Sequence, residues 1–208
     1  MALGKKTPLK KMQVKKIKEP KLIALDLGCG DNKVTYDQLV QIGLIADGSQ
    51  VEIIGVDNQK CKSVDKQHDL TKFPYPFKDN SVDTIYSAHF VEHLTGEQRI
   101  KFFNEVYRIL KPNARIRLIH PYYKSARAVQ DPTHQFPPIC EESYLYWTKQ
   151  FREENKLGHY LGNCNFSFNI FYTFMDNIWI NRNEETRNFA IRHYFNVVAD
   201  MIVDLTKA

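Results

Sequence analysis

The segment Leu22–Lys33 constrains the fold of this chain more than any other. It begins with the apolar run Leu22–Leu27, passes through a turn with glycines at 28 and 30, and precedes a predicted helix. An apolar run of this kind is typical of a strand buried on both faces of a parallel sheet. Two glycines two residues apart leave no Cβ to block a close approach of the backbone to a ligand. The segment therefore predicts an open α/β sheet that binds a nucleotide-like ligand at its first turn.

A second apolar run, Ile53–Asp57, ends on an acid. An acid at the tip of the second strand is placed to accept hydrogen bonds from both hydroxyl groups of a ribose. Lys33 stands where the dinucleotide fingerprint requires a third small residue, and the turn does not supply a Walker loop. Asp26, just before the turn, would repel a pyrophosphate and attract an ammonium group. S-adenosylmethionine has an ammonium group and a ribose but no phosphate, so it meets these constraints.

Further motifs follow in a characteristic order. The segments are Asp26–Gly30, Asp57, His68–Leu70, Ser87–Leu94 and Glu105–Ala114. These segments resemble class I S-adenosylmethionine-dependent methyltransferases, in particular the methyltransferase type 11 group. In the order given, they correspond to motif I, the ribose-binding acid, the adenine loop, the strand-four segment and the turn before strand five of that family. The resemblance covers the chain from Leu22 to His120.

The resemblance implies a Rossmann-like α/β fold with a seven-stranded, mostly parallel sheet and an antiparallel last strand. Residues 21–208 are expected to form one methyltransferase domain with a loop and helix insertion around 121–160, after a basic, flexible segment of residues 1–20. A third strand is expected to be short or missing. Hydrophobic spacing and capping signals predict the helices, which are expected over 34–45, 95–110, 141–155 and 184–198.

The same resemblance assigns roles in cofactor binding. Asp26 would hold the methionine ammonium group, Asp57 the ribose and Asp69 the adenine amino group. Ser87 and His89 end the fourth strand beside the methionine moiety, where binding often uses the backbone. The complete expected set is Asp26, Gly28, Cys29, Gly30, Asp57, Asn58, Asp69, Leu70, Ser87 and His89.

A polar and aromatic loop after the fifth strand supplies candidates for the acceptor side. His120 follows that strand at the carboxyl edge of the sheet, where ligands bind in open α/β folds. Asp131 and His134 are three residues apart across a proline turn, so the carboxylate could orient the imidazole. An imidazole can take a proton from an acceptor at neutral pH. We predict His120, His134 and Asp131 as catalytic candidates, and Tyr122, Tyr123 and His134 as acceptor-binding candidates. The alternative is that Asp131 caps a turn and that His134 and the tyrosines serve packing.

The spacing of His89, Glu92 and His93 raises the question of a metal site. It does not match the H-E-x-x-H pattern, and the Glu-His-Leu piece recurs without metal in the family that the chain resembles. No metal is therefore expected. The four cysteines are scattered without a C-x-x-C pair. This pattern indicates a reduced, cytoplasmic protein without structural zinc.

Positive charge is concentrated at the N-terminus. The first 21 residues carry eight lysines and one glutamate, a net charge of +7, which leaves −2 for the remainder of a chain of net charge +5. We predict a small-molecule acceptor, because the remainder is not basic. The alternatives are an enzyme that acts on RNA or another polyanion through the lysine-rich segment, and a protein that binds S-adenosylmethionine without catalysis. No apolar run approaches the ~20 residues of a membrane span, and no secretory signal is expected.

Overall fold

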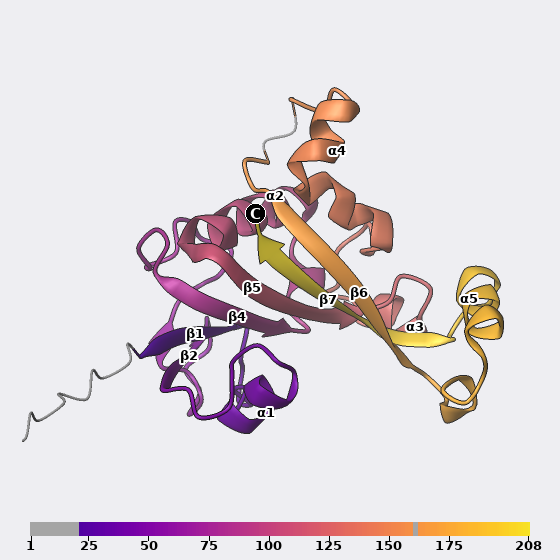
Figure 1. Cartoon of the computed structure of the whole chain (residues 1–208), viewed down its shortest axis with the longest axis horizontal. Coiled ribbons are helices and arrows are strands. Elements are labelled where there is room, and N and C mark those ends of the chain that lie inside the picture. Colours follow the sequence, from indigo (N-terminus) through magenta and orange to yellow (C-terminus); the bar gives the residue numbers. More distant parts are fainter. Residues whose placement is uncertain (1–20, 160–161) are drawn as a thin grey trace, which may run out of the picture.

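A seven-stranded sheet with the order β3-β2-β1-β4-β5-β7-β6 forms the centre of the molecule, in a computed structural model that describes residues 21–159 and 162–208. The strands are β1 (Leu22–Leu27), β2 (Val51–Asp57), β3 (Lys66–Gln67), β4 (Val82–Ala88), β5 (Leu110–Pro121), β6 (Phe166–Phe174) and β7 (Val198–Lys207). Strand β7 is antiparallel to both β5 and β6, whereas the other pairs are parallel (Figure 1). The predicted Rossmann-like sheet with an antiparallel last strand is therefore confirmed. The lysine-rich segment 1–20, for which flexibility was predicted, lies outside the described residues.

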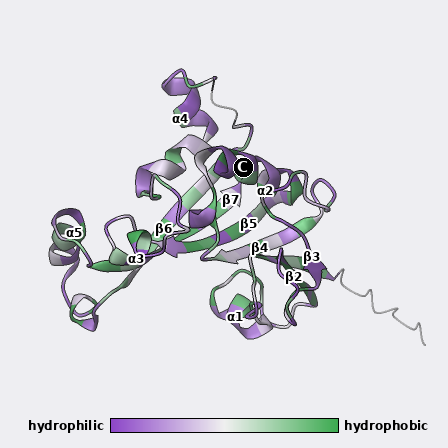
Figure 2. Cartoon of the chain, turned by 180° about the vertical axis from the view of Figure 1, so that it is seen from behind, coloured by the Kyte–Doolittle hydropathy of each residue, from purple (hydrophilic) through white to green (hydrophobic). Residues whose placement is uncertain are grey.

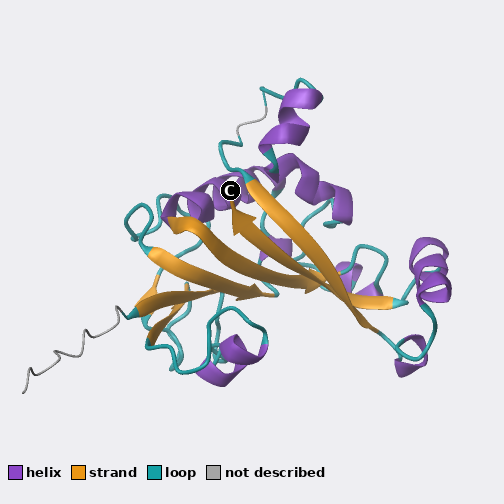
Figure 3. Ribbon diagram, viewed as in Figure 1, coloured by secondary structure: helices purple, strands orange, loops and turns teal. Residues whose placement is uncertain are grey.

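Helices cover both faces of the sheet. They are α1 (Tyr36–Gln41), α2 (Gly96–Ile109), α3 (Ala126–Val129), α4 (Lys149–Glu154) and α5 (Glu184–His193), with the 3-10 turns η1 (Val91–His93), η2 (Glu141–Trp147) and η3 (Asn177–Trp179). Successive residues of a strand face opposite sides of the sheet. Accordingly, Ala24 of β1 packs in a cluster with Leu39 of α1, whereas Leu25 packs in a cluster with Phe102 of α2. Helix α5 lies beyond the ends of β6 and β7 (Figure 3).

The core is concentrated on the central strands, where hydrophobic residues gather in Figure 2. Leu25, Val56, Ile85 and Leu118 are completely buried, one on each of four neighbouring strands. Burial of such a side chain contributes about 1.5–3 kcal/mol relative to exposure. These strands therefore provide firm support for the loops that follow their carboxyl ends. Within the described residues, no helix combines the length and the apolar character that crossing a membrane would require.

Helix α2 begins as its sequence predicts. The backbone N–H of Gln98 donates to Thr95 Oγ1 at 3.3 Å, and the backbone N–H of Thr95 donates to Gln98 Oε1 at 2.9 Å. This capping box satisfies two N–H groups that the first turn leaves without helical partners. The cap thus separates α2 from the short turn η1, which carries Glu92 and His93.

Two predicted helices are shorter or divided. The helix predicted over 34–45 is present only as α1, because Gly43 takes a left-handed φ of 70° and turns the chain. Leu44 and Ile45 nevertheless remain buried against the same face of the sheet. The helix predicted over 141–155 is interrupted at Thr148, whose extended backbone ends η2 and whose side chain caps α4.

The helix predicted over 184–198 also ends early. Helix α5 stops at His193, Tyr194 is extended, and Asn196 has a left-handed φ of 61°. Val197 and Val198 are buried in the main core, and Val198 opens strand β7. Burial of these valines against the sheet outweighs the helical periodicity of the sequence.

Candidate cofactor and acceptor site

The glycine turn after β1 is tied to the tip of β2. The backbone N–H of Gly28 donates to the Val56 carbonyl at 2.9 Å, and that of Gly30 donates to Asp57 Oδ2 at 3.0 Å. Both glycines have positive φ, 77° at Gly28 and 48° at Gly30. A Cβ at position 28 would lie 2.8 Å from the Cβ of Phe90, whereas a Cβ at position 30 would meet no atom within 4 Å. The turn therefore needs glycine at 28 and leaves open space beside 30.

Asp26 lies in the interior directly below this turn. It is 3% exposed, and its Oδ2 accepts a hydrogen bond of 2.6 Å from the backbone N–H of Val34. Burial raises the pKa of the Asp26 carboxyl to about 6. The nearby ammonium of Lys33 pairs with Asp65 at 2.5 Å. Asp26 is thus a buried carboxylate whose charge is only partly compensated by the protein.

The carboxylates predicted for the ribose and adenine sides are held by backbone contacts. Asp57 Oδ1 accepts a hydrogen bond of 2.9 Å from the backbone N–H of Gln59. Asp69 Oδ1 accepts hydrogen bonds from the backbone N–H of Thr71 at 2.9 Å and from its hydroxyl at 2.6 Å. The bonds from Thr71 lower the pKa of Asp69. Both acids are therefore oriented before any ligand binds.

The remaining residues of the predicted cofactor set differ in exposure. Leu70 is 3% exposed and Cys29 is 7% exposed, and the Cys29 thiol lies 3.8 Å from the Ser63 carbonyl. Asn58 is exposed, and its backbone carbonyl accepts a hydrogen bond from the side-chain amide of Gln67. Leu70 and Cys29 are thus buried, whereas Asn58 is exposed directly after the tip of β2.

The end of strand β4 contributes Ser87 and His89. The buried Ser87 hydroxyl donates to the Leu27 carbonyl at 2.7 Å, which joins the ends of β4 and β1. His89 has a left-handed φ of 53°, and its backbone N–H donates to the Ile119 carbonyl at 2.8 Å. Its imidazole Nδ1 lies 3.4 Å from Glu92 Oε1, and this interaction raises the pKa of His89. Ser87 thus serves the fold, whereas the His89 side chain is exposed and lies beside Glu92.

His120 lies at the carboxyl end of β5, where it was predicted, but its side chain is completely buried. The residue is 0% exposed and ends β5 beside β7. Its Nδ1 lies 3.0 Å from the Pro121 carbonyl, and its Nε2 lies 2.8 Å from the Tyr144 hydroxyl. Burial lowers the pKa of His120. Because both ring nitrogens are bonded inside the protein, the geometry does not present His120 to an acceptor.

Tyr122 and Tyr123 follow strand β5 and lie beside Glu141 and helix α5. The hydroxyl groups of the buried Tyr122 and of Tyr172 both donate to Glu141 Oε1, at 3.0 and 2.7 Å. Tyr122 and Tyr123 line a surface pocket of about 350 Å³ together with residues of α5. An acceptor-binding role for the two tyrosines stays a prediction, and this pocket is where an acceptor would contact them.

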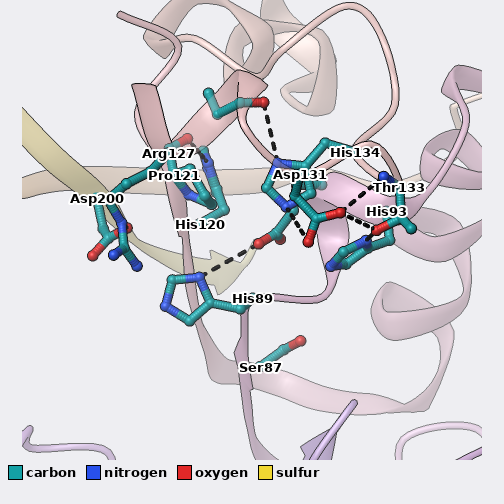
Figure 4. A network of polar contacts seen from close by, with 12 residues as sticks. Ser87, His89, His93, His120, Pro121, Arg127, Asp131, Thr133, His134 and Asp200 are labelled. Atoms are coloured by element: carbon teal, nitrogen blue, oxygen red, sulfur yellow. Dashed lines mark hydrogen bonds and ion pairs between the residues drawn. The ribbon is translucent and has the colours of Figure 1, made fainter. Parts of the chain in front are cut away.

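Asp131 and His134 lie together, but their contact is long. His134 Nε2 is 3.9 Å from Asp131 Oδ2, which exceeds hydrogen-bond distance. Asp131 Oδ1 instead accepts from the Thr133 hydroxyl at 2.7 Å, and this bond lowers the pKa of Asp131. The same hydroxyl lies 2.9 Å from His93 Nδ1. The ring centroids of His93 and His134 are 4.8 Å apart, and the two side chains lie close together in Figure 4. The loop thus brings His134 to His93, which the sequence analysis did not predict.

Arg99 of α2 is a further residue that sequence reasoning missed. It is 7% exposed. Its guanidinium donates to the carbonyls of Val91 at 3.3 Å, Glu92 at 3.4 Å, Gln135 at 3.1 Å and Pro137 at 2.7 Å. The arginine therefore holds the loop that carries His134 against η1. No sequence signal reveals this, because the loop returns to α2 only in the folded chain.

Comparisons with known proteins agree with this architecture. Residues 25–118 match the family described as a methyltransferase domain. The fold is similar to that of a SAM-dependent methyltransferase from Archaeoglobus fulgidus, with a TM-score of 0.59 and 21% identity over 90% of this chain and 86% of that chain. The sequence has no significant match among curated proteins.

Two other solved structures share the fold at lower identity. A SAM-dependent methyltransferase from Methanosarcina mazei has a TM-score of 0.51 and 14% identity over 91% of this chain and 93% of that chain. Geranyl diphosphate C-methyltransferase from Streptomyces coelicolor has a TM-score of 0.51 and 12% identity over 91% of this chain and 73% of that chain. Identities in this range show a common fold and do not identify the methyl acceptor. The methyltransferase-domain match over residues 25–118 and the order of the sheet are consistent with a class I S-adenosylmethionine-dependent methyltransferase, and they support S-adenosylmethionine as the cofactor.

Proposed function

We propose that this chain transfers a methyl group from S-adenosylmethionine to a small-molecule acceptor, and that residues 21–208 act as one domain with an insertion around 121–160. One observation carries the proposal. The glycine turn is bonded directly to the acid at the tip of β2, through the 3.0 Å contact between the Gly30 N–H and Asp57 Oδ2. Asp26 lies buried beneath the same turn. Asp57, suited to a ribose, and Asp26, suited to an ammonium group, therefore lie on either side of the glycine turn at residues 28–30.

In this proposal each end of the cofactor has its own partner. Asp57 accepts hydrogen bonds from the ribose hydroxyl groups, and Asp69 accepts one from the adenine amino group beside Leu70. Asp26 attracts the methionine ammonium group, directly or through water. Cys29 and Asn58 contribute mainly backbone, and Ser87 and His89 border the methionine moiety at the end of β4.

Methyl transfer asks little covalent chemistry of the protein. A lone pair of the acceptor attacks the methyl carbon in line with the carbon–sulfur bond, which breaks and leaves S-adenosylhomocysteine. The principal contribution of the enzyme is then alignment of the two reactants. On the acceptor side, His134 Nδ1 lies 3.1 Å from the Ala128 carbonyl. A carbonyl only accepts, so the neutral ring donates from Nδ1 and carries its lone pair on Nε2. That lone pair suits either proton uptake or coordination of a cation.

A small acceptor is preferred on electrostatic grounds. Positive charge lies in residues 1–21, and the remainder of the chain has a net charge of −2. A domain that binds nucleic acid through its folded surface usually carries a basic patch. The polyanion alternative therefore depends on the lysine-rich segment.

Titration with S-adenosylhomocysteine tests the cofactor assignment. We expect micromolar binding by the wild type and at least a tenfold loss in Asp57→Ala, because hydrogen bonds to a charged group contribute about 1.5–3 kcal/mol. Asp37→Ala, an exposed acid of α1, is the matched control and should bind like the wild type. Absence of binding by the wild type, or unchanged affinity in Asp57→Ala, would refute the proposal. Conversion of S-adenosylmethionine to S-adenosylhomocysteine with a panel of small acceptors then separates an enzyme from a protein that only binds the cofactor.

A further inference from the structure

Glu92 is a buried carboxylate without hydrogen-bond partners. The residue is 6% exposed, and within residues 21–159 and 162–208 neither of its carboxylate oxygens accepts a hydrogen bond. The imidazole of His89, 3.4 Å from Oε1, is an adjacent polar group. An ionised carboxylate that is removed from water without compensation is strongly unfavourable. The guanidinium of Arg99 is also close, but it donates to the backbone carbonyl of Glu92 and not to its carboxylate. Both carboxylate oxygens therefore remain available to bind a cation directly.

Two histidines surround the same carboxylate. One ring nitrogen of His93, one of His134 and one carboxylate oxygen of Glu92 all lie within 4.8 Å of one another. Ligand atoms at about 2.1 Å from a tetrahedral ion are roughly 3.4 Å apart. A shortening of at most about 1.4 Å in the distances between the ligand atoms would thus suffice for the three groups to bind one ion.

The hydrogen bonds of both imidazoles leave the same nitrogen available. The Thr133 hydroxyl gives its only proton to Asp131, so toward His93 it acts as acceptor and His93 Nδ1 is the donor. The Ala128 carbonyl likewise accepts from His134 Nδ1. Each neutral ring therefore presents the lone pair of Nε2. Orientation of a ligating histidine through a hydrogen bond from its other nitrogen is typical of metal sites in proteins.

The two segments that carry these ligands are held in place independently of any ion. The backbone N–H of Gln135 donates to the Glu92 carbonyl at 2.9 Å. Arg99 binds the carbonyls of Glu92 and of Gln135 with one guanidinium nitrogen, at 3.4 and 3.1 Å. Figure 4 shows His93, Thr133, Asp131 and His134 gathered on one side of His89. The arrangement is thus a built site and not a chance approach of exposed side chains.

We propose that Glu92, His93 and His134 bind a divalent first-row transition-metal ion, with His89 beside them as a fourth donor. Two imidazoles and one carboxylate favour ions such as Zn²⁺, Co²⁺ or Ni²⁺ over Mg²⁺ and Ca²⁺, which prefer oxygen ligands. Because η1 follows the end of β4, an ion bound there would lie close to the methionine end of the cofactor, from which the methyl group is transferred. On the proposed function, it would hold an oxygen of the acceptor, such as a hydroxyl or phosphate oxygen. His134 Nε2 is then a ligand and not a general base.

The test is metal binding by the full chain after treatment with a chelator. Titration with Co²⁺, followed by visible absorption, and with Zn²⁺, followed by calorimetry, should give one ion per chain at micromolar or lower concentration, whereas Mg²⁺ should not bind in the same range. Glu92→Gln and His134→Ala should each weaken Co²⁺ binding at least tenfold. His193→Ala, an exposed histidine at the end of α5, should bind like the wild type. A wild type that takes up neither Co²⁺ nor Zn²⁺ would overturn the proposal.

Thermal denaturation separates a ligand from a merely structural residue. Without metal, Glu92→Gln should unfold at the same or a higher temperature than the wild type, because it removes a buried carboxylate whose oxygens have no hydrogen-bond partner among the described residues. With Zn²⁺, the unfolding temperature of the wild type should rise and that of Glu92→Gln should not. Destabilisation of metal-free Glu92→Gln, together with unchanged Co²⁺ affinity, would contradict a ligand role. Titration of the metal-free protein with S-adenosylhomocysteine distinguishes failure of this proposal from failure of the cofactor assignment.

Discussion

At the scale of single residues, Asp26 shows how a binding site can conflict with stability. Its carboxylate is 3% exposed, and burial raises its pKa to about 6. The folded state therefore disfavours the charged form, although the charged form is the one that would attract the ammonium group of the cofactor. Perturbed carboxyl groups of this kind are frequent at functional sites.

Asp26→Asn should therefore raise stability and weaken cofactor binding. Below the unfolded-state pKa of about 4 the burial penalty is absent, and it is fully present above the folded-state pKa of about 6. A shift of about two units corresponds to about 3 kcal/mol, so the gain from Asn should be measurable by denaturation at pH 8 and small at pH 4.5. An equal effect at both pH values would contradict this origin.

The same carboxyl should give cofactor binding its pH dependence. Since the pKa of Asp26 is about 6, its ionised fraction falls about tenfold between pH 7 and pH 5. The affinity of the wild type for S-adenosylhomocysteine should fall by a similar factor over that interval. Calorimetry across this range, with Asp26→Asn as a control that lacks the dependence, checks the expectation.

At the scale of elements, α2 connects the candidate site to the rest of the fold through arginines near its two ends. Near its start, Arg99 donates to four carbonyls of η1 and the 135–137 segment. Near its end, Arg108 pairs with Glu105 and donates to the Tyr75 carbonyl. Both clusters join segments that are distant in the sequence, but only the first borders the site.

These two arginines form a matched pair for mutation. Arg99→Met should lower the free energy of unfolding by about 2–4 kcal/mol, because it leaves buried carbonyl groups without hydrogen-bond donors. It should also weaken Co²⁺ binding at least tenfold, since the loop with His134 loses its anchor. Arg108→Met should lower the free energy of unfolding without a selective effect on Co²⁺ binding. Equal effects of both variants on metal affinity would argue against a positioning role for Arg99.

At the scale of the whole molecule, the positive charge and the candidate site lie in different parts of the sequence. Residues 1–21 carry a net charge of +7, against −2 for the remainder. Residues 21–159 and 162–208 contain the sheet and all the candidate site residues. Binding of a polyanion and binding of the cofactor should therefore be separable.

Deletion of residues 1–20 tests this separation. The truncated chain should retain the S-adenosylhomocysteine affinity of the full chain within about twofold. Any binding of an RNA oligonucleotide by the full chain should weaken steeply with salt and disappear on truncation. Salt-sensitive RNA binding by the truncated chain, measured by fluorescence anisotropy, would favour the nucleic-acid alternative over a small acceptor.

Local features of the fold were predictable because they depend on neighbouring residues. The run Leu22–Leu27 is a strand, and Thr95 caps α2 with Gln98 as predicted. The left-handed turn at Gly28 follows from the absence of a Cβ. The helix predicted through Val198 was wrong, because burial against the sheet competes with helical periodicity and cannot be read from one segment.

The sequence by itself determined the strand–turn–helix unit, the acids at the strand tips and hence the match of residues 25–118 to a methyltransferase domain. Each of these depends on backbone preference and hydrophobic pattern within a few residues. Only the tertiary structure decided the roles of the histidines. It buried His120 against Tyr144 and brought His134 beside His93 and the buried carboxylate of Glu92. This placement depends on how the loop that carries His134, some forty residues after His93, packs against the segment that follows β4. The free energy of that contact depends on the tertiary structure and cannot be inferred from neighbouring residues in the sequence.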